Sequence, residues 1–538
     1  SDDVYSEGGQ AGKRPDRALT VYCNKLKKLF PDSVIIAGGI EASLRRFAHY
    51  DYWDDRVMPS VLLDSKADLI IYGMGEKPLF EILSLIKKGV PAGDIKDVRG
   101  TLYAAEYDSF SAKLKEKIAV HEAVFCPTAQ EVMTDKIKYI KAFNIQTENN
   151  DPYSAKAVIQ KHGSVYVVQN PPAFPLTVAE VDAVYALPYE RTYHPMYIGG
   201  IPAITEVKYS LTSSRGCFGG CNYCALNYHQ GKIIQKRSKE SILAEAERFL
   251  GEKDFKGIIN DVGGPTANFR NQACAKQKTA GACTKKDCIG FGVCKNLDID
   301  HSEYLDVLKS LRELDGVRKV FVRSGIRYDY LMYDGNESFF DELVKYHISG
   351  QLKVAPEHCA DSVLKLMNKP QFKLYEAFRD KFYAKCKRYG KEQYLVPYFI
   401  SSHPGSTLND AVALAVYLKS IGSMPEQVQD FYPTPSTKST TMFYTELNPD
   451  TMESVYVAKD AESKKMQRAL LQYRKKENYD IVKKALITAG RSDLIGFSPD
   501  CLIKPLKEEI TALKQNITDK KQKITDKKQN TTDKKARK

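Results

Sequence analysis

The sequence has no apolar run close to the roughly 20 residues that a membrane-spanning helix needs. Residues 34–40 are typical of its longest apolar segments, and they include two glycines. No secretory signal pattern is present either. We therefore expect no membrane association and predict a cytoplasmic location. The chain opens on Ser1 and not on Met, so we expect a fragment or a processed form.

A strong overall charge is also absent from most of the chain. Of the 538 residues, 43% are hydrophobic and 27% are charged, a composition that excludes global disorder. The formal net charge is +13, but residues 504–538 contain 12 basic and 5 acidic residues and account for +7 of it. This segment repeats Thr-Asp-Lys-Lys from residues 518, 525 and 532, and we predict a solvated or disordered basic tail. Nucleic acid could bind there, but the folded part does not require such a partner.

The 12 cysteines come with no secretory feature, so a disulfide framework is not expected. Seven of them lie between Cys217 and Cys294, which indicates metal or cluster ligation in a reducing compartment. The other five are scattered and are predicted to be buried or incidental: Cys23, Cys126, Cys359, Cys386 and Cys501.

The N-terminal pattern predicts an α/β domain over residues 1–200. Residues 33–37 and 67–71 form short apolar strands followed by glycines, and residues 17–29 and 78–86 form helices. Apolar strands separated by helices are typical of a parallel, doubly wound sheet that is covered on both faces. The glycines lie where such sheets bind ligands, although ordinary turns would also use them. Only part of such a sheet is visible, so we expect this domain to be incomplete.

Six strands alternate with helices after residue 200. The strands are predicted at 207–212, 258–262, 319–323, 352–355, 394–400 and 427–431, and the helices at 241–249, 303–314, 339–346, 373–388 and 409–418. This pattern predicts a parallel barrel or partial barrel, whose chemistry lies at the C-terminal ends of the strands. We assign the barrel to residues 201–480, with a cysteine-rich insert at 270–297. A C-terminal region at 433–503, with helices at 463–475 and 479–489, overlaps its end, and the basic tail covers 504–538.

Three cysteines directly follow the first barrel strand. Cys217, Cys221 and Cys224 are separated by three and two residues, and glycines lie between them. A compact loop of this kind can place three sulfurs at three corners of a cubane iron–sulfur cluster and leave one iron open. A structural zinc site would need a fourth ligand, and His229 is the candidate for that alternative.

A second group of cysteines lies in a lysine- and glycine-rich insert after the second strand. Cys274, Cys283, Cys288 and Cys294 are separated by eight, four and five residues, which does not match a zinc-ribbon pattern. We consider a second iron–sulfur cluster and a structural zinc equally, with free thiols as the remaining alternative.

The loop that contains Cys217, Cys221 and Cys224 resembles that of the radical S-adenosylmethionine (SAM) enzymes. The resemblance implies a partial (β/α)₆ barrel, a 4Fe-4S cluster on these cysteines, and SAM bound to the open iron. It further implies that a 5′-deoxyadenosyl radical abstracts hydrogen from a substrate that the resemblance does not specify. An electron donor such as flavodoxin or ferredoxin would reduce the cluster.

Longer segments resemble the YgiQ-like family of radical SAM proteins. They are residues 38–53 (GGIEASLRRFAHYDYW), 72–76 (YGMGE), 263–268 (GGPTAN), 322–327 (VRSGIR), 354–358 (VAPEH) and 403–406 (HPGS). The resemblance extends from residue 1 to about residue 503. Members of the family generally carry more residues at the N-terminus, so we expect this chain to be N-terminally short.

The resemblance also suggests which residues bind SAM. Gly263 and Gly264 follow the second strand, where related enzymes hold the SAM amino group. The usual acidic residue is replaced by Pro265-Thr266, so backbone carbonyls would have to bind the amino group, and an ordinary turn is the alternative. Ser324 and Arg327 follow the third strand, where side chains reach the SAM ribose or carboxylate. For Arg327, a surface ion pair is the alternative.

Two residues after the fourth strand are candidates for the substrate side of the site. Glu357 and His358 face the same end of the barrel, and the histidine could act as an acid or a base near neutral pH. A structural hydrogen-bonded pair is the alternative.

The N-terminal sheet also resembles the later half of cobalamin-binding domains. The chain has no Asp-x-His-x-x-Gly motif to supply the usual cobalt ligand, so we do not expect cobalamin. Two other functions stay open. One is a tRNA- or protein-modifying methyl- or methylthiotransferase of the same superfamily. The other is a non-enzymatic zinc protein that binds nucleic acid through its tail, which predicts zinc in place of iron and salt-sensitive binding.

Overall fold

The computed structural model describes residues 2–425 and 428–506, so the predicted tail repeats lie outside the described residues. The chain divides into two compact units. The first comprises Ser1–Gly405 and Phe431–Val457, and the second comprises Ser406–Asp430 and Ala458–Lys538. The α/β fold class is confirmed in the first unit, which holds the N-terminal sheet and most of the barrel strands.

A six-stranded sheet in the order β1-β4-β5-β8-β7-β6 forms the N-terminal part of the first unit. Its strands are β1 (Ile36–Ala37), β4 (Leu69–Ile71), β5 (Thr101–Ala105), β6 (Ala123–Phe125), β7 (Ala157–His162) and β8 (Val165–Gln169). The expected parallel pairing is present between β1 and β4 and again between β6 and β7. The three other pairs are antiparallel, so the sheet is mixed where the sequence predicted a parallel one.

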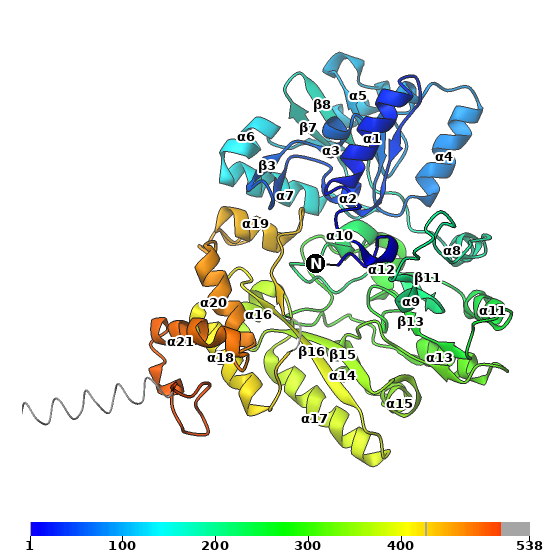
Figure 1. Cartoon of the computed structure of the whole chain (residues 1–538). Coiled ribbons are helices and arrows are strands. Elements are labelled where there is room, and N and C mark those ends of the chain that lie inside the picture. Colours follow the sequence, from blue (N-terminus) through cyan, green and yellow to red (C-terminus); the bar gives the residue numbers. More distant parts are fainter. Residues whose placement is uncertain (1, 426–427, 507–538) are drawn as a thin grey trace, which may run out of the picture. The chain divides into compact units, whose positions relative to one another are not determined.

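Successive residues of the central strands pack into two different cores, because side chains alternate across a sheet. Val158 and Val167 join a core with α1 (Ala18–Leu29), α3 (Val61–Ser65) and α7 (Lys136–Glu148). Ile159 and Val168 join the opposite core with α4 (Glu76–Lys87) and α5 (Ala112–Ala119). Helices therefore cover both faces of this sheet, as the apolar strands predicted (Figure 1).

Short parallel strands form the barrel region of the first unit. They are β9 (Ser210–Thr212), β12 (Ile258–Ile259), β13 (Asp261–Gly263), β14 (Lys319–Val320), β15 (Gln351–Glu357) and β16 (Tyr394–Ser401). β13 pairs with β9, β12 with β14, and β15 with β16, all in parallel. The first strand begins later than predicted, because α9 (Ile204–Val207) is helical. The predicted sixth strand is seen as β17 (Gln429–Asp430) in the second unit, and residue 427 lies outside the described residues.

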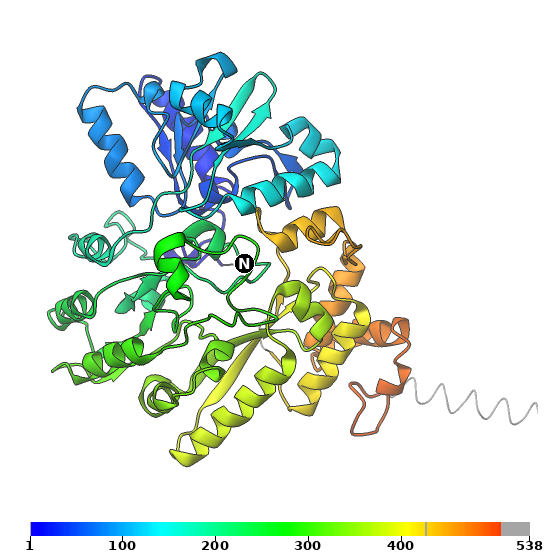
Figure 2. The same ribbon diagram turned by 180° about the vertical axis from the view of Figure 1, so that it is seen from behind.

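Helices alternate with these strands as the sequence predicted. They are α11 (Lys239–Leu250), α13 (Ser302–Glu313), α15 (Ser338–Glu342), which continues as a π-helical turn at Leu343–His347, and α17 (Phe372–Arg388). Each of the four buries apolar side chains, for example Ile242 on α11 and Phe378 on α17. Figures 1 and 2 show these helices on the outer side of the strands. The predicted partial barrel is thus confirmed, and the C-terminal ends of its strands carry the candidate site.

The second unit contains a small helical core of its own. Its helices are α18 (Leu408–Ser420), α20 (Ala461–Leu471) and α21 (Tyr479–Thr488), each close to its predicted range. Val412, Leu470 and Leu486 are fully buried where these helices pack together. Among the helices of both units that the structure describes, none is long and apolar enough to cross a membrane.

Candidate active site

A small hairpin closes the base of the loop that carries the first three cysteines. β10 (Ser214–Arg215) pairs antiparallel with β11 (Gln235–Lys236). Within the loop, the Cys217 backbone N–H donates to the Gly231 carbonyl at 3.0 Å, and α10 (Leu226–Gln230) begins directly after Cys224 and Ala225. All three thiols are free. The predicted cluster ligands are therefore presented together by one closed loop.

Hydrogen-bond donors lie beside the partly buried sulfur atom of Cys217. The Gly219 N–H donates to Cys217 Sγ at 3.4 Å, and the Thr266 hydroxyl lies 3.6 Å from the same sulfur. Burial raises the pKa of Cys217, and the neighbouring Cys221 raises it further. Burial likewise raises the pKa of Cys224 to about 12. A bound metal lowers the pKa of a coordinating thiol, so Cys217 and Cys224 would hold iron as thiolates.

Gly219 allows two other groups to reach the loop. A Cβ atom at this position would lie 3.2 Å from Cys217 Sγ and 2.8 Å from Arg327 Nη1. Any other residue would therefore displace either the sulfur or the guanidinium group. The absence of a side chain at Gly219 thus lets the backbone approach the Cys217 sulfur closely, as the ligand loop of an iron–sulfur cluster requires.

Arg327 is buried, so the surface ion pair considered for it is wrong. Its Nε and Nη2 atoms donate to the Asp329 carboxylate at 2.8 and 2.5 Å, and its Nη1 atom lies 3.2 Å from Cys221 Sγ. Burial alone would lower the pKa of Arg327, but the charges of Asp329 and Cys221 outweigh it and raise the pKa. A permanent cation is thus held against the cysteine loop.

Glu357 contacts the cysteine loop through Tyr223, which lies between the second and third cysteines. The Tyr223 hydroxyl donates to Glu357 Oε1 at 2.6 Å. Glu357 is buried at the end of β15 with a φ of 69°, and burial raises the pKa of its carboxyl. His358 is also buried, and its Nδ1 accepts from the Ala360 N–H at 3.0 Å. The structure therefore brings Glu357 into contact with the loop.

A cavity of about 900 Å³ collects the other predicted residues. Gly263, Gly264 and Ser324 line it, and Arg327 does not. Asp261 lines it as well and accepts hydrogen bonds from the Ser324 N–H at 3.0 Å and from the Ser324 hydroxyl. Glycines from the N-terminal sheet form the facing wall: Gly38, Gly39, Gly73 and Gly75. The cavity thus lies at the carboxyl ends of strands from both the sheet and the barrel.

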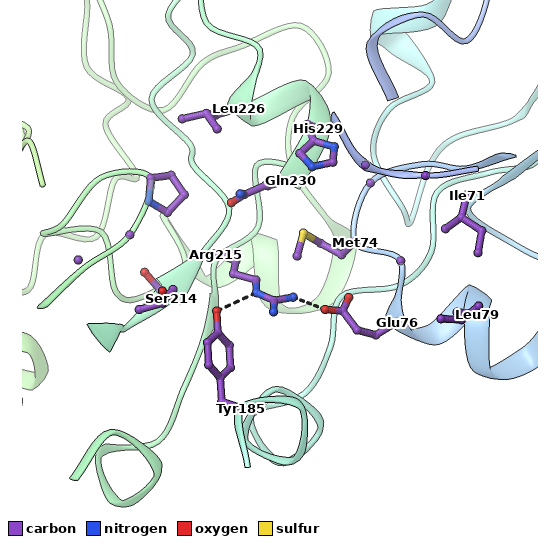
Figure 3. Close-up of a pocket in the computed structure, with 18 of the residues that line it drawn as sticks. Ile71, Met74, Glu76, Leu79, Tyr185, Ser214, Arg215, Leu226, His229 and Gln230 are labelled. Atoms are coloured by element: carbon purple, nitrogen blue, oxygen red, sulfur yellow. Dashed lines mark hydrogen bonds and ion pairs between the residues drawn. The ribbon is translucent and has the colours of Figure 1, made fainter. Parts of the chain in front are cut away.

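An ion pair that sequence reasoning missed crosses this cavity. Figure 3 shows Arg215, directly before the cysteine loop, pointing between Tyr185 and Glu76. Arg215 Nη1 lies 2.5 Å from Glu76 Oε1, and Arg215 Nε donates to the Tyr185 hydroxyl at 3.2 Å. Glu76 ends one of the family-like segments, but nothing in that segment pointed to a partner 139 residues away.

The far side of the cysteine loop faces a second cavity of about 590 Å³. Cys221 and Cys224 line it together with Cys283 of the second group. The residues that flank the loop, Arg215 and Leu226, line the first cavity. Cysteines from both groups therefore line the same cavity.

Three free thiols on one loop match the ligand set of a cubane cluster with one open iron. Within residues 2–425 and 428–506, no three His, Cys, Asp or Glu side chains converge closely enough to hold one metal ion. Each thiolate of a cubane binds a different iron, so its ligands lie farther apart than those of zinc. His229, the alternative zinc ligand, instead places Nδ1 2.8 Å from the Ser43 hydroxyl.

Three of the five scattered cysteines are buried, one of the two alternatives predicted for them. Cys23, Cys126 and Cys386 are buried, while Cys359 and Cys501 are partly exposed. None of the five lines either of the two cavities beside the cysteine loop.

Comparisons with known proteins place the chain in the radical SAM class. A family model described as "Radical SAM N-terminal" matches residues 1–210, and a domain of unknown function (DUF3362) matches residues 426–538. A UPF0313 protein of Clostridium botulinum (strain Okra / Type B1) is 58% identical over 504 residues, which cover 93% of this chain and 77% of the relative. A UPF0313 protein of Clostridium perfringens (strain SM101 / Type A) is 53% identical, with coverage of 93% and 75%. The chain belongs to the UPF0313 family, the YgiQ-like family of radical SAM proteins.

Two solved structures of radical SAM enzymes show a more distant likeness. The methyltransferase TsrM from Kitasatospora setae, with tryptophan and a SAM analogue bound, is 14% identical at a TM-score of 0.44. The match covers 81% of this chain and 62% of that chain. The cobalamin-dependent enzyme OxsB is 12% identical at a TM-score of 0.43, with coverage of 89% and 65%.

Proposed function

We propose that this chain is a radical SAM enzyme whose 4Fe-4S cluster is held by Cys217, Cys221 and Cys224. The proposal rests on one observation. Three free thiols lie on one closed loop, and the buried Arg327 cation contacts the sulfur of Cys221. When bound, the cluster and SAM supply a 5′-deoxyadenosyl radical that abstracts a hydrogen atom from the substrate. A cluster with thiolate ligands is anionic, so a fixed cation at 3.2 Å from Cys221 Sγ favours its binding.

SAM would bind in the first cavity against Gly263, Gly264 and Ser324. A Cβ atom at Gly264 would lie 2.9 Å from the Ser214 carbonyl oxygen, so glycine keeps the cavity wall and the hairpin in contact. The acidic residue that Pro265 replaces has a structural counterpart, because Asp261 lines the same cavity. Its carboxylate suits the positively charged amino group of SAM.

The roles of Arg327 and Glu357 in this proposal are to position the cysteine loop. Arg327 Nη1 donates to the Gly219 carbonyl at 3.3 Å as well as approaching the Cys221 sulfur. Glu357 holds Tyr223, the residue between the second and third cysteines. Both side chains are buried, so they also exclude water from the barrel side of the loop.

The test is anaerobic reconstitution of the full chain with iron and sulfide, followed by metal analysis and EPR of the reduced protein. We expect a cluster signal that changes when SAM is added. The variant Cys217→Ala/Cys221→Ala/Cys224→Ala should lose about four irons per chain and the whole SAM-dependent change. Zinc in place of iron, or an iron signal that SAM leaves unaltered, would contradict the proposal.

A second variant tests the SAM side independently of the cluster. Gly264→Ala should keep the iron content of the unaltered chain. The added methyl group disturbs the cavity wall, so the variant should need at least about tenfold more SAM for the same EPR change. Gly335→Ala is the matched control, since a Cβ atom there meets nothing within 4 Å. Equal SAM responses of the two variants would exclude this cavity wall from SAM binding.

A further inference from the structure

We infer that Cys274, Cys283, Cys288 and Cys294 hold a second iron–sulfur cluster beside the first. This inference goes beyond the proposed function, because a radical SAM reaction needs only the first three cysteines. The four thiols are free, and the insert that carries them is otherwise without a role in the candidate site.

Short-range contacts connect all four cysteines of the insert. The Gln277 side chain donates to Cys288 Sγ at 3.8 Å, and its backbone N–H donates to the Cys274 carbonyl at 3.1 Å. The Cys294 N–H donates to the Cys288 carbonyl at 2.9 Å across a tight antiparallel turn. Lys276 Nζ, on α12 (Ala275–Ala280) directly after Cys274, lies 3.5 Å from Cys283 Sγ.

The insert is fixed to the body of the first unit by two aspartates. The Ala282 N–H donates to Asp151 Oδ2 at 2.7 Å. Asp287 forms an ion pair with Lys232 at 2.9 Å and accepts a hydrogen bond from Asn368 at 2.8 Å. These contacts hold the segment that carries Cys283 and Cys288 in place, as a preorganised metal site requires.

Asn368 also connects the insert to the first cysteine loop. Its Nδ2 atom donates to the Gly220 carbonyl at 2.9 Å as well as to Asp287. Cys217 and Cys288 pack against the same buried cluster, which includes Phe218 and Phe269 stacked at a centroid distance of 3.8 Å. The two cysteine groups are thus neighbours in the first unit.

The spacings of eight, four and five residues between the four cysteines do not match a zinc-ribbon pattern. Cys283 lines the same cavity as Cys221 and Cys224, so the second group borders the first cluster site. Four thiolates would close all four irons of a cubane, so the second cluster could exchange electrons but would have no open iron for SAM.

Exposed lysines surround the site and favour a multiply charged anion. Lys276, Lys278, Lys285, Lys286 and Lys295 are all exposed, and Asp287 is the single acidic residue between Cys274 and Cys294. A cubane with four thiolate ligands carries more negative charge than one with three. The local positive potential therefore lowers the cost of holding it.

The decisive test uses the variant Cys217→Ala/Cys221→Ala/Cys224→Ala, because it leaves the second group intact. After anaerobic reconstitution of this full chain, we expect about four irons and four sulfides per chain. After reduction, we expect an EPR signal that SAM does not alter. A variant that retains no iron, or that binds one zinc in its place, would overturn the inference.

Two further variants separate this result from the proposed function. Cys274→Ala/Cys283→Ala/Cys288→Ala/Cys294→Ala should lose about four irons relative to the unaltered chain and keep the SAM-responsive signal. If the unaltered chain itself showed no SAM-responsive signal, that result would contradict the proposed function and leave the second cluster unaffected. Cys501→Ala is the matched control, since Cys501 belongs to neither group, and its iron content should equal that of the unaltered chain.

Discussion

At the scale of single residues, the buried Arg327–Asp329 pair is the most consequential charge pair of the site. Both side chains are almost fully buried and form two hydrogen bonds with each other. Removing one partner of a buried pair costs about 3–5 kcal/mol, because the other charge is left uncompensated. In urea unfolding of the iron-free protein, Arg327→Met should lower the free energy of unfolding by this amount relative to the unaltered chain. The double variant Arg327→Met/Asp329→Leu should recover most of it, and a double variant as unstable as the single one would contradict this account.

His403 makes the stability of the chain depend on pH. Its Nδ1 donates to the Pro404 carbonyl at 2.8 Å, so Nε2 accepts from the Ser439 hydroxyl at 2.7 Å and the ring is neutral. Burial lowers its pKa from 6.5 to about 3. Between these values the unfolded chain binds more protons than the folded chain. Stability is therefore complete above the unfolded pKa and falls as the pH is lowered toward the folded one.

The variant His403→Gln tests this pH dependence. It removes the titrating group, so its unfolding free energy should change less between about pH 7 and about pH 5 than that of the unaltered chain. Within the window, one histidine contributes up to about 1.4 kcal/mol per pH unit. Urea unfolding at several pH values measures the slope. Equal slopes for the two proteins would show that His403 protonates as easily in the folded state as in the unfolded one.

At the scale of elements, helix α18 depends on its N-terminal cap. The Asp410 N–H donates to the Thr407 hydroxyl at 3.2 Å, and the Asp410 carboxylate accepts from the Thr407 N–H at 2.9 Å. Thr407→Ala removes one partner of this capping box and should destabilise the second unit by about 0.5–2 kcal/mol. Thr407→Ser retains the hydroxyl and should stay close to the unaltered chain. Thermal unfolding compares them, and equal losses for both variants would point to the threonine methyl group instead.

The helices were predictable from sequence because their apolar positions recur at helical spacing. Helix α1 was expected at 17–29 and is Ala18–Leu29, and α17 was expected at 373–388 and is Phe372–Arg388. The hairpin of β7 and β8 was missed, although Gly163 and Ser164 separate two β-branched runs, a recognisable hairpin signal. Missing it also hid the antiparallel pairs that make the sheet mixed.

At the scale of the whole molecule, the candidate site divides into residues that sequence spacing reveals and residues that only folding brings together. The first cysteines lie within eight residues of one another, so a single loop must present them. Glu357 reaches Tyr223 from 134 positions away, and Glu76 reaches Arg215 from 139 positions away. Such pairs depend on the order and register of strands, which local patterns do not specify. For the same reason, the neighbourhood of the two cysteine groups became visible only in the fold.

Metal loading should stabilise the first unit, because a group that binds only the folded chain shifts the unfolding equilibrium by mass action. Both cysteine groups lie on segments that depend on distant contacts, such as the Asn222 N–H to the Met367 carbonyl at 3.0 Å. We therefore expect the reconstituted chain to unfold at a higher temperature than the iron-free chain in anaerobic calorimetry. Alanine variants of the first group should lose part of this increase, and those of the second group should lose another part. Iron removal by a chelator should reverse it, and identical unfolding temperatures with and without iron would show that neither group binds metal in the folded chain.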